Sequence, residues 1–244
     1  MTMRNLKRVL TIALIAMASL GISISTIVAQ NYAQASASDG TLRRLRVPIL
    51  MYHYVSQLPE NPDELRRGLT VTPQQFREHL DYLKARQYTS VSLYEIYLAL
   101  TQGYRLPDQP VALTFDDGYK EHLTTVVPAL RERGLTGTFF IITGNADNQR
   151  PGYLNWDEVN QIASQGMEIA SHTKSHVDLR TSTHATLVYE ILGSIESIQA
   201  HVRTTTIAFA YPMGRYNEET MELLRQVNIA AAVSTSHGTT HTSD

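Results

Sequence analysis

Apolar, β-rich runs alternate with helical segments along most of the 244-residue chain. Each run is bounded by Gly, Pro or polar residues, a pattern that predicts a strand. Strand followed by helix, repeated along one chain, is typical of an α/β domain with a parallel sheet. Six such runs suit either a barrel or a wound sheet. The predicted strands are residues 47–54, 111–115, 137–142, 167–171, 206–211 and 229–234.

Three polar positions mark the starts of helices. Thr72, Ser92 and Asn155 are residue types that cap helix N-termini, and each has Gln or Glu three positions later. This spacing is the capping-box pattern. Thr72 is also followed by proline, which is well tolerated at the first helical position. Apolar residues then recur at helical spacing, so residues 73–86 are predicted to form a helix that packs on the outside of the sheet.

The first 37 residues have the order of an export signal. Basic residues precede an uncharged run of 21 residues at positions 9–29, and small-residue sites end at positions 35 and 37. The run could also just span a bilayer as an anchor, but its second half is only weakly apolar, which favours cleavage. We therefore predict an exported protein that is secreted, periplasmic or associated with the cell envelope.

The domain organisation predicted from these patterns is simple, because no internal linker or repeat interrupts the alternation of strands and helices. Residues 1–37 are predicted to be a signal peptide or an N-terminal membrane anchor, and 38–46 a linker. Residues 47–235 form one α/β domain. Residues 236–244 are polar, and we expect them to be a frayed tail, as chain ends often are.

Charge and cysteine content narrow the chemistry. The formal net charge is -2, and loss of residues 1–37 would remove three positive charges and bring it to -5. This argues against nucleic acid as a partner. The chain has no cysteine, so any metal must be held by histidine or carboxylate side chains.

The stretch LTFDDGYK at residues 113–120 places two aspartates, Asp116 and Asp117, directly after a predicted strand. In a parallel barrel this is the carboxyl-end rim, where active sites form. Gly118 then allows the chain to turn into the next helix. Taken alone, the motif is more often a turn than a catalytic pair.

A second motif changes that interpretation. SHTKSH at residues 171–176 puts His172 and His176 four positions apart after another predicted strand. Together with a carboxylate from a neighbouring loop they would make a metal site of two histidines and one acid, with positions open for water and substrate. If Asp117 binds the ion, Asp116 is left to act as a general base. The implied reaction is hydrolysis of an amide or an ester.

Three motifs in this order, TFDDGY at 114–119, SHTKSH at 171–176 and FAYPMG at 209–214, resemble the polysaccharide deacetylase family. This is carbohydrate esterase family four, with its chitooligosaccharide-deacetylase homology domain. The resemblance covers residues 46–235 and implies a single-domain, distorted and incomplete (β/α) barrel. The segments VPILMYHYV and LTVTPQQFREHLDYLKARQYTSVSL are most similar to the exported, biofilm-related branch that deacetylates poly-β-1,6-N-acetylglucosamine.

The resemblance also implies an activity and roles for four residues. Asp116 would be the catalytic base, and Asp117, His172 and His176 would hold Zn²⁺ or another divalent ion such as Co²⁺ or Ni²⁺. The expected reaction removes acetyl groups from N-acetylglucosamine units of an extracellular or cell-wall polysaccharide and releases acetate. Two alternatives stay open: an O-acetyl glycan esterase such as an acetylxylan esterase, and a catalytically impaired glycan-binding module.

Further residues are candidates for substrate contacts. By resemblance, the backbone N–H of Met213, which follows Pro212, would help to hold the oxyanion. Tyr211 and Trp156 could form walls on which a sugar stacks, although Trp156 could equally be a packing residue at a helix start. His53, at the end of the first predicted strand, could reach the substrate or support a metal ligand. It could equally well be a structural residue of the core.

The third motif and the end of the chain depart from the family pattern. Ala210 stands where most members have an arginine that orients the base, although the poly-N-acetylglucosamine branch also tends to lack it. Many members supply a general acid from a segment later in the chain. His237 or His241 could stand in for it, but the expected frayed tail leaves the general acid unassigned.

Overall fold

The computed structural model describes residues 38–202 and 204–243, so the predicted signal peptide or anchor at residues 1–37 lies outside the described residues. The strands and helices reported below all belong to the compact unit that begins at Thr41. Among the described residues, no helix combines the length and the apolar character needed to cross a bilayer.

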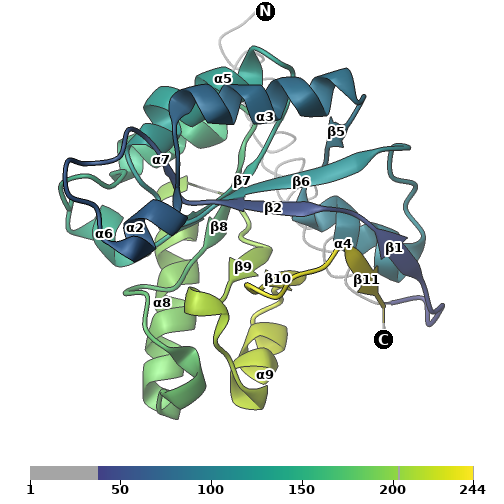
Figure 1. Ribbon diagram of the computed structural model, residues 1–244. Helices are drawn as coiled ribbons and strands as arrows, with labels where there is room; N and C mark the ends of the chain where they lie inside the picture. The colour runs from purple at the N-terminus through teal and green to yellow at the C-terminus, as the bar shows by residue number, and fades with distance from the viewer. Residues whose placement is uncertain (1–37, 203, 244) are drawn as a thin grey trace, which may run out of the picture. The chain divides into compact units, whose positions relative to one another are not determined.

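The centre of this unit is a parallel sheet in the order β10-β9-β8-β7-β6-β2, with the short strand β5 (Thr89–Ser90) paired to the start of β6. Its ends, β10 and β2, are not paired with each other, so the sheet is a curled half-barrel and the predicted incomplete barrel is confirmed (Figure 1). The strands are β2 (Ile49–Tyr52), β6 (Pro110–Phe115), β7 (Thr138–Ile141), β8 (Glu168–Ser171), β9 (Ala208–Ala210) and β10 (Ala231–Val233).

Each of these six strands lies within or overlaps a predicted run, with one correction. The run 47–54 was predicted as a single strand, but β2 ends at Tyr52. After His53 the chain forms β3 (Tyr54–Val55), which pairs with β4 (Thr70–Val71) in a separate two-stranded sheet. The break at His53 turns the chain away from the main sheet at its carboxyl edge, where the site is built.

Helices surround the sheet, and the capping predictions are confirmed. Thr72, Ser92 and Asn155 each form a complete capping box. Figure 1 shows α3 and α5 above the middle of the sheet and α8 and α9 below it. The helices are α2 (Glu64–Gly68), α3 (Pro73–Ala85), α4 (Leu93–Gln102), α5 (Val127–Arg131), α6 (Thr143–Asp147), α7 (Trp156–Ser164), α8 (His184–Val202) and α9 (Glu218–Gln226), with shorter turns η1 (His122–Val126), η2 (Leu179–Thr181) and η3 (Pro212–Gly214).

The two faces of the sheet pack against different helices. Because neighbouring side chains on a strand point to opposite faces, Phe115 and Phe139 pack with α3, α5 and α7 on one face. Ala112 and Ala170 pack with α4 on the other. The buried face of α3 is the one predicted from its apolar spacing. These two layers fix the strand ends from which the site residues project.

The ends of the described unit differ from the prediction. Residues 44–46 of the predicted linker form β1 (Arg44–Arg46), which pairs antiparallel with β11 (Thr240–Thr242). His241 Nε2 also bonds to the Val47 carbonyl oxygen at 2.9 Å. The expectation of a frayed tail is therefore wrong for these residues. Their pairing uses backbone groups, which the polar side chains of both segments do not reveal.

Candidate metal and catalytic site

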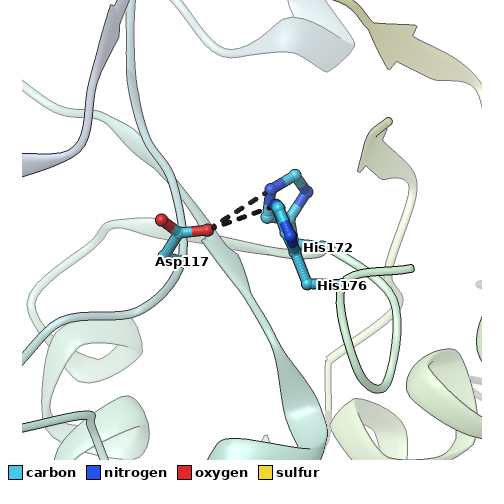
Figure 2. Close-up of side chains that lie close together, drawn as sticks. All are labelled: Asp117, His172 and His176. Carbon is cyan, nitrogen blue, oxygen red and sulfur yellow. Dashed lines mark ion pairs between the residues drawn. The ribbon is translucent and has the colours of Figure 1, made fainter. Parts of the chain in front are cut away.

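Two loops at the carboxyl edge of the sheet bring three predicted metal ligands together. Asp117 Oδ1 lies 3.5 Å from His172 Nε2 and 3.7 Å from His176 Nε2, and one ligand atom from each residue lies within 4.8 Å of the others. Figure 2 shows the carboxylate facing both imidazole rings. The chain thus gathers one carboxylate oxygen and two imidazole nitrogens, a donor set suited to Zn²⁺ with positions left for water and substrate.

The hydrogen bonds of Asp117 support this reading. Its Oδ2 accepts a hydrogen bond from the Tyr119 hydroxyl at 2.8 Å, whereas its Oδ1 is buried and has no hydrogen-bond partner. A buried carboxylate oxygen without a partner is costly, and a divalent cation between it and the two imidazoles would remove that cost. The residues present therefore fit a divalent metal ion.

The loop after β6 has the geometry needed to direct two adjacent acids differently. Asp116 keeps its backbone in the sheet, since its N–H donates to the Tyr52 carbonyl at 2.9 Å. Asp117 and Gly118 both have φ of 74°, so the chain turns sharply at Asp117. A Cβ at position 118 would lie 3.3 Å from Ile141 Cδ1. A side chain at position 118 would be strained by the positive φ and would crowd Ile141, so glycine is favoured there.

His172 is held by the neighbouring strand. Its Nδ1 lies 2.8 Å from the carbonyl oxygen of Ala210, so Nδ1 carries the hydrogen and Nε2 presents its lone pair to Asp117. Burial lowers the pKa of His172 to about 4, although the charge of Asp117 opposes that change. The ring is therefore neutral at pH 7, which is the form that binds a metal.

His176 is brought round by a tight turn and not by a helix. Thr173 and His176 have φ of 65° and 60°, and the His176 N–H donates to Thr173 Oγ1 at 2.9 Å. The turn is stabilised by Glu190 of α8, whose carboxylate is buried. Glu190 accepts hydrogen bonds from the backbone N–H groups of Lys174 at 3.0 Å and Ser175 at 2.8 Å, and from the Ser175 hydroxyl.

Asp116 sits beside the three ligands without joining them. It is 6% exposed, and burial raises its pKa well above the usual range, with the charge of Asp117 raising it further. Its Oδ1 has no hydrogen-bond partner, and its Oδ2 lies 3.8 Å from His53 Nε2. A cation held by Asp117 would offset the repulsion between the two acids and lower the pKa of Asp116.

The site opens into a cavity of about 540 Å³. Asp116 and the three ligands line it, as do His53, Tyr211 and Met213 among the predicted substrate residues. Tyr211 stacks on Tyr216 with ring centroids 4.2 Å apart, and burial raises the pKa of Tyr211 to about 12. It is therefore a neutral phenol. Met213 is 44% exposed and has φ of 55°.

Two predicted substrate residues do not line this cavity. Pro212 is buried inside η3. Trp156 stacks on His201 with ring centroids 4.4 Å apart and donates its indole N–H to Asp147 at 2.9 Å. The prediction that Trp156 forms a wall of the site is corrected, because its ring stacks on His201 of α8 and packs against the hydrophobic core. The packing alternative describes its position.

A second, smaller cavity adjoins the first at Asp116. It has a volume of about 280 Å³ and shares Asp116 and Tyr211 with the larger cavity. His237 and His241, the two candidates for a general acid, both line it. His241 Nε2 is already bonded to the Val47 carbonyl, which leaves His237 as the better placed of the two.

Comparison with known proteins agrees with the motifs. The sequence model of the polysaccharide deacetylase family matches residues 103–232, a span that contains the acidic pair and both histidines. The chain belongs to the polysaccharide deacetylase family. The predicted family is therefore confirmed, and so is the predicted class of enzyme, a deacetylase that acts as a hydrolase.

This polysaccharide deacetylase is similar to other named proteins of the family and to proteins of solved structure. It is 29% identical over 203 residues to Bacillus subtilis YxkH, which is named as a polysaccharide deacetylase, with 83% of this chain and 69% of that one covered. It is 30% identical over 138 residues to the poly-β-1,6-N-acetyl-D-glucosamine N-deacetylase of Escherichia coli K12. That match covers 50% of this chain but only 20% of the larger enzyme.

A solved structure supports the fold. The Streptococcus pyogenes deacetylase PplD, determined in complex with acetate, superposes with a TM-score of 0.75 at 28% identity. The match covers 80% of this deacetylase and 86% of PplD.

Sequence reasoning missed several residues of the deacetylase site. Glu190 lies on a helix well away from the motifs in sequence, and only its place on the buried face of α8 could have marked it. Tyr54 and Tyr119 were also missed as a pair, although their hydroxyls lie 2.5 Å apart and one bonds Asp117. Tyr119 is part of the first motif, so its contact with Asp117 was the easier to anticipate.

Proposed function

We propose that this protein is a divalent-metal-dependent deacetylase that removes acetyl groups from N-acetylglucosamine units of an extracellular or cell-wall polysaccharide and releases acetate. One observation carries the proposal. Asp117, His172 and His176 converge around an unpartnered carboxylate oxygen, and a second buried acid, Asp116, stands beside them in the same cavity. A glycan-binding site would have no need for that second acid.

Asp117, His172 and His176 are the proposed ligands, with Zn²⁺ as the first choice and Co²⁺ or Ni²⁺ as substitutes. When bound, the ion supplies Lewis acidity to a water nucleophile and to the acetyl carbonyl of the substrate. The protein fixes the donor atoms in advance through the contacts of His172 with Ala210 and of Asp117 with Tyr119. This preorganisation keeps the His172 imidazole aimed at the Asp117 carboxylate.

Asp116 is the proposed general base, which takes a proton from the attacking water. Its raised pKa, moderated by the cation on Asp117, brings it toward the range in which a carboxylate is an effective base near neutral pH. His53, 3.8 Å away, is proposed to orient Asp116. The N–H of Met213 is proposed to donate to the developing oxyanion, and Tyr211 to bound the space for the acetyl group. His237 is the proposed source of the proton for the leaving amine.

The proposed substrate class is supported by the names of the matched proteins. Among the matched proteins is an enzyme named for deacetylating poly-β-1,6-N-acetyl-D-glucosamine, and a chitooligosaccharide deacetylase of Rhizobium leguminosarum bv. trifolii is 27% identical over 115 residues. An acetylated glycan of N-acetylglucosamine is the substrate class that these names share. Such a polymer lies outside the cell membrane, which agrees with the proposed export of the protein by residues 1–37.

The proposal is tested by acetate release from metal-reconstituted protein. The substrates are β-1,6- and β-1,4-linked N-acetylglucosamine oligomers and acetylated xylan, and the variant is Asp116→Asn. We expect acetate from at least one N-acetylglucosamine oligomer and a loss of about 10²-fold or more in kcat for the variant. Asp157→Asn is the control for the charge change, because Asp157 is an exposed first-turn residue of α7 and should retain full activity.

Three other outcomes would change the proposed function or the proposed role of Asp116. Acetate from xylan alone would make the protein an O-acetyl esterase. About one bound zinc per chain without acetate release from any of the glycans would favour a glycan-binding module. Equal activity of Asp116→Asn and the unaltered protein would remove Asp116 from the mechanism.

Export is tested separately by cell fractionation and N-terminal sequencing. We expect the protein outside the cytoplasm with an N-terminus near residue 38, as removal of a signal peptide requires. A membrane-bound protein with an intact N-terminus would indicate the anchor instead. Cytoplasmic protein would contradict export in either form.

A further inference from the structure

Three tyrosines and two arginines form a continuous stack along the cavity that holds the proposed metal ligands. The Arg66 guanidinium lies 3.2 Å from the ring centre of Tyr54, and Tyr54 stacks on Tyr119 at 4.0 Å. Tyr119 contacts Tyr153 at 5.1 Å, and the Arg150 guanidinium lies 5.0 Å from the Tyr153 ring centre. All five residues line the cavity. We call this group the Tyr–Arg stack.

The centre of the stack is not built as an aromatic platform for a sugar ring. Tyr54 has Arg66 against one face and Tyr119 against the other, so neither face is open to a ligand. Burial and nearby Asp117 raise the pKa of Tyr119, which keeps it a neutral hydrogen-bond donor. The stack therefore offers the cavity hydroxyl groups and, at its two ends, guanidinium groups.

The charges of both guanidinium groups are left without a carboxylate partner among the described residues. Arg66 donates to Ser56 Oγ at 3.0 Å, and its Nε is buried without an acceptor. Arg150 makes one long contact, 3.3 Å, with Asn145 Oδ1. By contrast Arg133, away from the cavity, pairs with an aspartate at 2.7 Å. Paired surface arginines of that kind are ordinary, whereas two unpaired ones in a single cavity point to an anion.

One further acid, Asp63, lines the cavity. Asp63 Oδ1 accepts the backbone N–H of Arg66 at 2.6 Å and caps α2, so part of its hydrogen-bonding capacity is already used. Asp116 and Asp117 face a site suited to a divalent cation, which would offset their two charges. Arg66 and Arg150 then leave the cavity along the stack with a net positive charge.

We propose that Arg66 and Arg150, one at each end of the stack, each bind an anionic substituent, a carboxylate or a phosphate, carried by the glycan beside the sugar that is deacetylated. The inference rests on the proposed deacetylase function and deepens it, because it makes the preferred substrate an acidic glycan. Guanidinium groups bind carboxylate and phosphate oxygens through pairs of parallel hydrogen bonds. Stacking on tyrosine holds them in place beforehand, which reduces the entropy lost on binding.

The experiment compares acetate release from three N-acetylglucosamine oligomers of equal length. One is neutral, one carries lactyl carboxylates on alternate sugars, and one carries glycerol phosphate. We expect kcat/KM of the metal-reconstituted protein to favour an acidic oligomer by about tenfold. Arg150→Met should remove part of that preference and leave turnover of the neutral oligomer unchanged within about twofold. The comparison between the two acidic oligomers identifies the anion.

Variants at both ends of the stack separate charge from structure. Arg66→Lys keeps the charge and should retain more of the preference than Arg66→Met. Arg86→Met is the matched control, because Arg86 also lies over a tyrosine, Tyr82 at 5.5 Å, but outside the cavity. Added salt should weaken the preference for the acidic oligomers and not the turnover of the neutral one.

Equal or better turnover of the neutral oligomer would overturn the inference, and so would variants that slow all three oligomers alike. Calorimetric binding of the same oligomers to the zinc-loaded Asp116→Asn variant gives a readout that does not depend on turnover. If no oligomer releases acetate, the proposed function fails. The binding comparison still decides whether the Tyr–Arg stack selects an anion.

Discussion

Glu190 offers the sharpest test of how the metal site is positioned, because it touches none of the proposed ligands. Its carboxylate accepts two backbone N–H groups and one hydroxyl from the turn between His172 and His176. Glu190→Ala would leave these donors without their partner, and a hydrogen bond to a charged group contributes about 1.5–3 kcal/mol. Since water can reach part of the turn, we expect a loss of about 3 kcal/mol in the free energy of unfolding.

The conservative variant should behave differently. In Glu190→Gln, the amide oxygen can replace Oε2, which accepts both backbone N–H groups, and the amide nitrogen can donate to the Ser175 hydroxyl. Only the charge is lost, so we expect a destabilisation of about 1 kcal/mol. Affinity for zinc should fall about tenfold or more in Glu190→Ala and much less in Glu190→Gln, as for other residues that support metal ligands.

Both quantities can be measured on the same samples, unfolding by urea titration of metal-free protein and zinc affinity by competition with a chelating dye. Glu196→Ala is the matched control, since Glu196 lies on the same helix and is exposed. It should change neither quantity appreciably. If Glu190→Ala behaves like Glu196→Ala, the turn holds His176 without help from α8, and the positioning role is refuted.

Three further predictions concern protonation, metal and backbone. Burial lowers the pKa of His122 to about 4 in the folded protein. As pH falls below 6.5, this histidine therefore takes up its proton first in the unfolded chain. The free energy of unfolding should then fall by up to about 3 kcal/mol between pH 6.5 and pH 4. In urea titrations of metal-free protein, His122→Gln should flatten that dependence, whereas His201→Gln, at an exposed position, should not. Removal of metal with a chelator should abolish acetate release and lower the Tm. Added zinc should restore both in the unaltered protein but not in Asp117→Ala. An unchanged Tm on metal removal would count against the site. Gly118→Ala should lower the free energy of unfolding by about 1–2 kcal/mol, because φ at this position is 74° and a neighbouring side chain is close. The loss should be larger than in Gly152→Ala, where φ is also positive but the space is open. Equal losses measured by thermal denaturation would show that only the backbone conformation matters.

The predictions from sequence were most accurate where the signal is local. A capping box needs only two residues three positions apart, so Thr72, Ser92 and Asn155 could be assigned without knowledge of the fold. Except for β2, the carboxyl ends of the main strands could be placed to within about one residue, because apolar runs stop at polar or glycine residues. Since the carboxyl ends of parallel strands meet at one edge, the aspartate pair and the histidine pair could be expected to meet there as well.

Tertiary structure alone decided the features that join distant segments. The pairing of Arg44–Arg46 with Thr240–Thr242 depends on backbone groups that carry no side-chain signature. The support from Glu190 and the contacts of Trp156 depend on which helix lies under which loop. Local sequence thus determined the reactive groups and the elements that carry them, because their signals span a few residues. Packing decided how each group is held and what surrounds it, because those contacts join residues far apart in the chain.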